Sequence, residues 1–341
     1  MTALLVVACT GPGPLVTPAG VPTPTAAAAA TDSTASATPT RTPIPTLDLP
    51  PITDLVEAGA QVIEANPLPD FAVTAAGYLW VGGVGMGIGL ISPEGEVIDD
   101  WEIPGGSCGA MDVGFEWIWS ATCEGPGLVA LAVEGQGNPP KSIEVGGIMP
   151  DSEASVGAGE GAVWMIVDHV PRQLVKVDHQ TLAVVARYDI EGSGTAVRAG
   201  EGGVWIADVI SNTIKRFDPA TEAVVATIEV GRKPQFLAVG EGAVWVMNQA
   251  DGTVSRIDPT SNTVVATIRL GEPIQGGDIA VGGGYVWLRG SDTLLFKIDP
   301  ATNAIVARYG PSSGSGSVAA DDNAVWITAH DITTIWRLPL P

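Results

Sequence analysis

Short runs of Val, Ile, Thr and Trp alternate with turn residues from residue 53 to the end of the chain. Short runs of β-branched and aromatic side chains favour strands over helices. The runs are separated by pairs such as Glu241-Gly242, which are typical of tight hairpin turns. One stretch predicts strands over 235–239, 243–248, 253–257 and 263–270. The pattern therefore indicates an all-β domain.

Four expected strands of this kind form a unit that repeats along the chain. The shortest interval between equivalent tryptophans is 39 residues (80 to 119) and the longest is 45 (119 to 164). Such intervals are typical of four-stranded propeller blades, so the repeat predicts a seven-bladed β-propeller. The Trp of the second strand recurs at Trp80, Trp119, Trp164, Trp205, Trp245, Trp287 and Trp326.

The seventh unit ends one strand short, after an expected strand over 333–338. The run 61–64 lies before the first unit, at the place that a fourth strand takes before every other unit. We expect this N-terminal strand to complete the last blade and to close the ring over residues 53–341. A closed ring leaves only short sheet edges, which limits edge-to-edge aggregation.

An Asp-Pro pair follows the third expected strand in three units, at residues 218–219, 258–259 and 299–300. Proline presets the backbone for a turn, and the Asp carboxylate can accept the N–H groups of the turn. We interpret these aspartates as structural.

The runs 244–248 (VWVMN), 253–258 (TVSRID) and 263–268 (TVVATI) resemble the YVTN-type β-propeller repeat. The wider group of such propellers includes the streptogramin (virginiamycin B) lyases. The resemblance covers residues 53–341 and concerns the fold, because propellers serve many functions. For a lyase it implies Glu at the third residue after each blade Trp, with catalytic His and Glu around Mg²⁺. The corresponding residues here are Gly83, Thr122, Val167, Asp208, Asn248, Gly290 and Ala329, of which only Asp208 could bind a cation in the same way.

The apolar run at residues 4–8 is followed by Cys9, which resembles the lipobox of bacterial lipoproteins. We expect residues 1–9 to act as a signal that ends at a lipidated Cys9, and the protein to work outside the cytoplasm, attached to the membrane only through this lipid. The run is short and no Lys or Arg precedes it, so the alternative is an apolar start with a free thiol. Residues 10–52 are rich in Pro, Thr and Ala, which predicts a disordered stalk.

The chain is strongly acidic, with 38 Asp and Glu residues against 16 Lys and Arg, and has a formal net charge of −22. This charge repels phosphate backbones, so we expect no nucleic-acid partner.

Two cysteines remain after Cys9. If Phe115-Glu116 is the hairpin turn of the second unit, residues whose numbers sum to 231 face each other, as 108 and 123 do. We therefore expect a Cys108–Cys123 disulfide, which suits an oxidising compartment. A metal site made by the two thiols is the alternative.

Polar residues occupy the loops that usually form the ligand face of a propeller. Asp168-His169 of the third unit and His330 of the seventh lie in equivalent loops. With Asp208 they are candidate acids, bases or metal ligands. The alternative is that these side chains are simply solvated.

The innermost strands carry Arg198, Asp112, Asp278 and Gln235, which we expect to contact a ligand at the axial mouth. Arg198 holds a carboxylate or phosphate in this interpretation. In the alternative interpretation it forms an ion pair with Asp112 across the channel.

Two hypotheses follow from these features. The first is a monomeric, non-catalytic binding or scaffold module that recognises an envelope protein, peptide or glycan and needs no cofactor. The second is a Mg²⁺-assisted lyase or hydrolase of the streptogramin lyase type.

Overall fold

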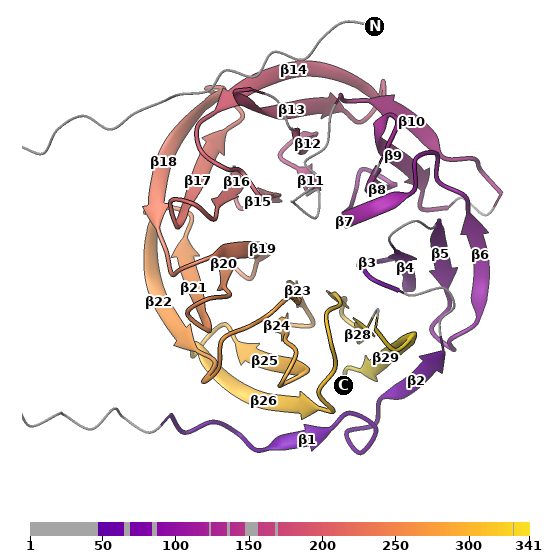
Figure 1. Cartoon of the computed structure of the whole chain (residues 1–341), viewed down its shortest axis with the longest axis vertical. Helices are drawn as coiled ribbons and strands as arrows, with labels where there is room; N and C mark the ends of the chain where they lie inside the picture. The colour runs from indigo at the N-terminus through magenta and orange to yellow at the C-terminus, as the bar shows by residue number, and fades with distance from the viewer. Residues whose placement is uncertain are drawn as a thin grey trace, which may run out of the picture. The chain divides into compact units, whose positions relative to one another are not determined.

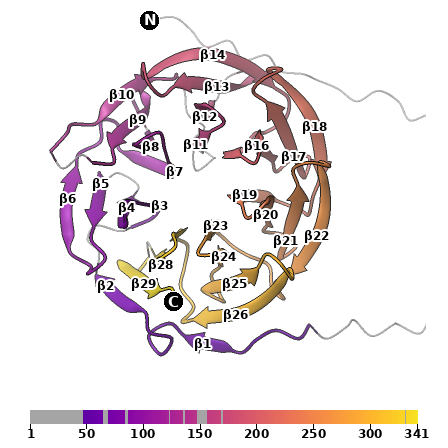
Figure 2. The ribbon, with the colours of Figure 1, turned by 180° about the vertical axis from the view of Figure 1, so that it is seen from behind.

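The computed structural model describes residues 47–64, 69–83, 87–122, 124–134, 137–146, 156–167, 170–329 and 331–341. These residues form seven sheets arranged as blades around a central axis (Figure 1). The predicted seven-bladed β-propeller is therefore confirmed. The view from behind shows the same ring, with the last labelled strands of the chain next to β2 (Figure 2).

Each blade is an antiparallel sheet whose first strand lies nearest the axis and whose last strand lies at the rim (Figure 1). The first three blades contain β3 (Ala72–Ala75), β4 (Tyr78–Gly82), β5 (Ile88–Ile91) and β6 (Val97–Trp101); β7 (Ser107–Gly114), β8 (Trp117–Thr122), β9 (Gly127–Ala132) and β10 (Lys141–Glu144); and β11 (Val156–Gly159), β12 (Ala162–Val167), β13 (Arg172–Asp178) and β14 (Ala183–Ile190).

The next three blades contain β15 (Ala196–Gly200), β16 (Gly203–Asp208), β17 (Thr213–Asp218) and β18 (Ala223–Glu229); β19 (Pro234–Gly240), β20 (Ala243–Asn248), β21 (Thr253–Asp258) and β22 (Thr263–Arg269); and β23 (Asp278–Gly282), β24 (Tyr285–Arg289), β25 (Leu295–Asp299) and β26 (Ala304–Gly310). The seventh contains β27 (Val318–Ala320), β28 (Ala324–Ala329), β29 (Thr334–Pro339) and β2 (Gln61–Glu64).

The ring closes as the sequence predicts. Strand β2 pairs antiparallel with β29, so that Gln61 lies opposite Arg337 and Glu64 opposite Thr334. The N-terminal strand thus supplies the outer strand of the last blade. The two ends of the domain are held together by the hydrogen bonds between β2 and β29.

One strand was not expected. Strand β1 (Ile52–Asp54) pairs in parallel with β26 and becomes the fifth strand of blade six, and Arg308 donates a hydrogen bond to the Pro50 carbonyl oxygen (2.7 Å). The compact unit begins at Leu47, whereas the predicted stalk extended to residue 52. The prolines suggested a stalk, but Pro50 and Pro51 precede β1 and leave its pairing with β26 intact.

The seven tryptophans are the largest side chains of the core, each 0 or 1% exposed. In five blades the indole Nε1–H donates to the carbonyl oxygen of the glycine five residues earlier, in the hairpin between the first two strands. In blade one Ala75 takes the place of that glycine, and Trp80 Nε1 has no partner among the described atoms. Tryptophan therefore anchors each blade through burial, and in these five blades it also holds the inner hairpin.

Adjacent blades are joined by side chains that the repeat alone does not reveal. Arg256 of blade five lies over the Trp245 ring (5.0 Å) and donates to the Pro300 carbonyl oxygen (2.6 Å) and to Asn303 Oδ1 (3.0 Å) of blade six. Arg216 makes the same contacts one blade earlier, with Pro259 and Asn262. The Asp-Pro turns of blades five and six therefore also accept hydrogen bonds from an arginine of the preceding blade.

The structural interpretation of the Asp-Pro aspartates is confirmed. Asp258 Oδ1 accepts hydrogen bonds from the backbone N–H groups of Thr260 (2.7 Å) and Ser261 (3.3 Å), which lower the pKa of Asp258. Asp218 and Asp299 accept equivalent bonds from Ala220 and Ala301 (both 2.8 Å).

No helix long and apolar enough to cross a membrane occurs within the described residues.

Candidate functional site

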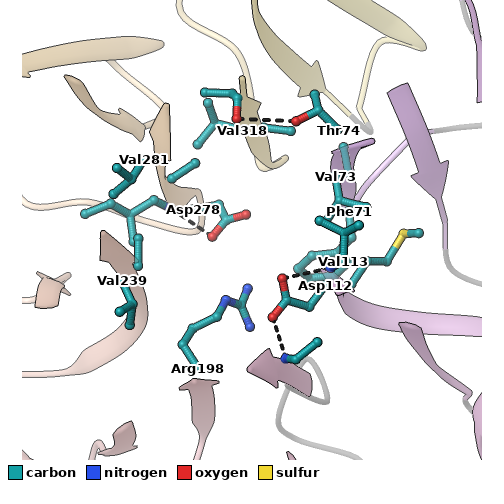
Figure 3. A pocket seen from close by; sticks show the side chains of 18 of the residues that line it. Phe71, Val73, Thr74, Asp112, Val113, Arg198, Val239, Asp278, Val281 and Val318 are labelled. Atoms are coloured by element: carbon teal, nitrogen blue, oxygen red, sulfur yellow. Dashed lines mark hydrogen bonds between the residues drawn. The ribbon is translucent and has the colours of Figure 1, made fainter. Parts of the chain in front are cut away.

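The innermost strands of all seven blades enclose an axial cavity of about 220 Å³ (Figure 3). Its wall is mostly Ala and Val, with Phe71, Thr74, Met111 and Ile279. Three charged side chains interrupt this apolar wall: Asp112 on β7, Arg198 on β15 and Asp278 on β23. Three of the four residues predicted at the axial mouth therefore lie together.

Asp112 is held between two neighbouring inner strands. Its Oδ2 accepts a hydrogen bond from the Ala158 N–H of blade three (2.8 Å), and its Oδ1 accepts one from the Val113 N–H (2.9 Å). Burial raises the pKa of Asp112, although the Arg198 charge and both N–H groups act in the opposite direction. The carboxylate thus joins blades two and three while it faces the cavity (Figure 3).

Asp278 joins blades six and seven in a similar way. Its Oδ2 accepts a hydrogen bond from Ser317 Oγ (2.5 Å), and its Oδ1 accepts one from the Ile279 N–H (2.8 Å). The residue is buried, and this burial raises the pKa of its carboxyl group against the lowering effects of Arg198 and Ser317.

Arg198 extends from blade four toward both carboxylates (Figure 3). Its guanidinium donates to the carbonyl oxygens of Val156 (2.8 Å) and Val197 (3.0 Å). Its charge opposes the rise that burial causes in the pKa of Asp278 and of Asp112. Arg198 thus acts electrostatically on Asp278 as well as on Asp112, the partner that the sequence suggested. The sequence did not suggest this second electrostatic interaction, because Asp278 does not align with the position of Arg198 in the repeat.

Gln235 is not among the described residues that line the cavity. The pairing of β19 with β20 shifts between Pro234 and Phe236, and Gln235 is the extra residue at this irregularity. A bulge reorients the side chains around it, which uniform alternation along the strand does not anticipate.

Asp208 is buried and its carboxylate is fully engaged. Lys215 Nζ lies 2.6 Å from Oδ2, and Oδ1 accepts hydrogen bonds from Ser193 Oγ (2.6 Å) and the backbone N–H groups of Ile210 and Ser211. Burial alone would raise the pKa of Asp208, but Lys215 and Ser193 hold it far below the usual value. In this arrangement Asp208 acts as a structural ion-pair partner.

The other predicted catalytic candidates, Asp168, His169 and His330, lie outside the described residues. Within the described ranges, no three His, Cys, Asp or Glu side chains are grouped so that they could hold a metal ion.

The strands that carry the predicted disulfide depart from a uniform register. Met111 pairs with Ser120, as the sum of 231 requires, but Ser107 pairs with Thr122. The pairing shifts between them, where Gly109 has a φ of 139°, a conformation that favours glycine. Cys123 lies outside the described residues, as does the side chain of Cys108, so the disulfide stays a prediction. Cys9 also lies outside them.

A second hollow was not anticipated. The two connections that flank blade six and the loop between β24 and β25 enclose a cleft of about 600 Å³. Its lining is polar and consists of Pro273, Gln275, Ser291, Asp292, Ser312, Ser313, Gly314 and Ser315. The one available signal in the sequence is Arg289 beside it, two residues after Trp287, where the other blades carry Gly82, Ala121, Ile166, Ala207, Met247 and Thr328.

No protein-family model matches the chain, and no curated protein matches its sequence. Solved structures do match it. The chain is 17% identical to a streptogramin B lyase, with a TM-score of 0.67, over 82% of this chain and 96% of that one. It matches the WD40 domain of Pan2 from Neurospora crassa at 9% identity and a TM-score of 0.61, over 80% and 90% of the two chains. It matches U3-55K at 10% identity and a TM-score of 0.65, over 82% and 98%.

The chain therefore has a seven-bladed propeller fold like that of streptogramin B lyase. At these identities the likeness concerns the fold alone. Because 1603 solved chains match, the fold does not by itself assign a function.

Proposed function

We propose that the chain is a non-catalytic binding module that recognises a peptide or protein segment at its axial cavity. The observation that carries this proposal is the group of Asp112, Arg198 and Asp278 in an otherwise apolar wall. Charges in an apolar surrounding interact more strongly with a ligand than charges in water. A concave site in which a few polar groups converge among apolar side chains is a common form of ligand site.

The two signs of charge indicate the chemistry of the ligand. A guanidinium is suited to a carboxylate, since its planar donors match the two carboxylate oxygens. The two carboxylates complement an ammonium group or amide donors. Peptides supply both kinds of group at their ends and in their side chains, so a peptide end is the ligand that fits this cavity.

We further propose that the module acts outside the cytoplasm, attached by a lipid at Cys9 and raised from the membrane by the Pro/Thr/Ala-rich segment. The support is the apolar run before Cys9 and the composition of residues 10–52. The net charge of −22 is consistent with a lipid anchor, because an acidic protein does not bind anionic headgroups directly.

Peptide binding to the purified full chain tests the proposal. An array of peptides, each with a free and an amidated C-terminus, is probed with wild type, Arg198→Gln and Arg269→Gln. We expect some peptides with free carboxylates to bind wild type, and the affinity to fall at least tenfold in Arg198→Gln. Arg269 is exposed on the outer strand of blade five, so Arg269→Gln is expected to bind as wild type does. If no peptide binds, or if both variants bind equally well, the proposal is wrong. Unchanged unfolding midpoints confirm that the variants are folded.

The alternative is a Mg²⁺-assisted lyase, and the fold shared with streptogramin B lyase favours it as the second candidate. Its catalytic residues would have to include Asp168, His169 and His330. Asp208 is already bound to Lys215, so it would have to break that pair before it could ligate a cation.

A further inference from the structure

The polar cleft at blade six is built from three loops that are far apart in the sequence. Pro273 and Gln275 belong to the connection from blade five, Ser291 and Asp292 to the loop after β24, and 312–315 to the connection into blade seven. The lining therefore presents hydroxyl groups, one amide and one carboxylate toward a common space of about 600 Å³. This volume lies within the range of small-molecule sites.

The serine-rich loop of this cleft is held in place from two sides. Asp331 accepts hydrogen bonds from Ser313 Oγ (3.0 Å) and the Gly314 N–H (2.8 Å). Arg289 donates to the carbonyl oxygen of Gly314 on the other side, and also to that of Thr328 (3.3 Å). These contacts restrain the loop at Ser313 and Gly314.

The burial of the Arg289 guanidinium has a free-energy cost. It is 0% exposed, and burial lowers its pKa to about 10, although the charges of Asp331 and Asp70 act in the opposite direction. A buried charge costs several kcal/mol unless it is well paired. Departures from the apolar pattern of a repeat tend to occur at functional positions.

The lining restricts the chemistry of the ligand. Pro273 is the sole apolar side chain among the described lining residues, so an apolar ligand would bury little apolar surface there. Asp292 and the net charge of −22 oppose phosphate, sulfate and other polyanions. Hydroxyl, amide and carboxylate groups instead match ligands that carry several hydroxyl groups.

We propose that this cleft is a second binding site, specific for a neutral or amino sugar of a glycan. Asp292 would accept hydrogen bonds from the sugar hydroxyls, Gln275 would both donate to them and accept from them, and the serines at 312 and 315 would offer further hydroxyl groups. This site is independent of the proposed peptide site, because it shares no lining residue with the axial cavity.

The test is glycan binding by the purified full chain on an array of neutral, amino and sulfated oligosaccharides. Gln275 and Asp292 are both exposed, so Gln275→Ala and Asp292→Ala are expected to fold normally. Asp322→Ala, at an exposed hairpin turn of blade seven, removes the same charge elsewhere.

We expect neutral or amino glycans to bind wild type and Asp322→Ala equally, and the affinity to fall at least tenfold in Asp292→Ala and Gln275→Ala. Binding is expected to be unchanged in Arg198→Gln, which separates this site from the peptide site. Three results would overturn the inference: no neutral or amino glycan binds, sulfated glycans bind best, or all variants bind as wild type does.

Discussion

At the scale of single residues, charged side chains hold this ring together. Arg256 and Arg216 each cover the Trp of their own blade and bind the turn of the next. Asp112 connects the inner strands of blades two and three, and Asp278 binds Ser317 directly before the inner strand of blade seven. An arginine over an aromatic ring that also makes charge-assisted hydrogen bonds contributes through both interactions.

Arg256→Ala is expected to lower the free energy of unfolding by about 2 kcal/mol, because it removes a cation–π contact and two hydrogen bonds from a charged donor. Arg269→Ala, on the exposed face of the neighbouring strand β22, is the matched control and should change it by less than about 0.5 kcal/mol. Urea unfolding measures both. An equal decrease in the free energy of unfolding in the two variants would contradict the conclusion that Arg256 stabilises the contact between blades five and six.

Two aspartate–cation pairs of equal length offer a second comparison. The Asp208–Lys215 pair is buried, whereas Asp251–Arg232 is exposed, and both have an N···O distance of 2.6 Å. Asp208→Asn leaves a buried ammonium without its partner and should cost about 3 kcal/mol at neutral pH. Asp251→Asn should cost less than about 1 kcal/mol.

The effect of Asp208 should also depend on pH. Its folded-state pKa lies below the unfolded value of about 3.9, so its stabilisation is complete above that pH and is lost as the pH falls further. The difference between wild type and Asp208→Asn in denaturant unfolding should therefore shrink below about pH 4. A difference that grows on acidification would show that the pKa is raised instead.

At the scale of elements, the hydrophobic pattern predicted most strands because each blade repeats the same alternation. The expected strand 243–248 matches β20 (Ala243–Asn248), and the closing strand 61–64 matches β2. Strand β1 could not be predicted, because its three exposed residues have no apolar alternation and follow two prolines. Its position depends on the neighbouring edge of β26, which local sequence does not encode.

Leu55 directly after β1 tests how far this unexpected segment contributes. Its side chain is 0% exposed and packs into the cluster around Trp287 and Trp336. Leu55→Ala should destabilise the domain by about 3 kcal/mol through lost burial and a cavity. Val56→Ala is the control, since Val56 is 55% exposed. If both substitutions are neutral in thermal unfolding, residues 47–56 are not part of the folded unit.

At the scale of the whole molecule, the repeated sequence pattern made the fold predictable. It predicted only part of the candidate site. The position of Arg198 opposite Trp205 follows from the repeat, and so does that of Asp112 opposite Trp119. The contribution of Asp278 depends on how seven separate strands converge on the axis. The cleft beside Arg289 depends on three loops whose lengths differ from blade to blade, and no periodic pattern describes them.

The central proposal is that this propeller binds without catalysing a reaction. The most direct measurement incubates the purified full chain with a cyclic streptogramin B and Mg²⁺, with and without a chelator. Linearisation appears as a chromatographic shift at unchanged mass. We predict no conversion at a protein concentration at which an authentic lyase completes the reaction. Conversion that the chelator abolishes would contradict the proposal and would make the protein a metal-dependent lyase.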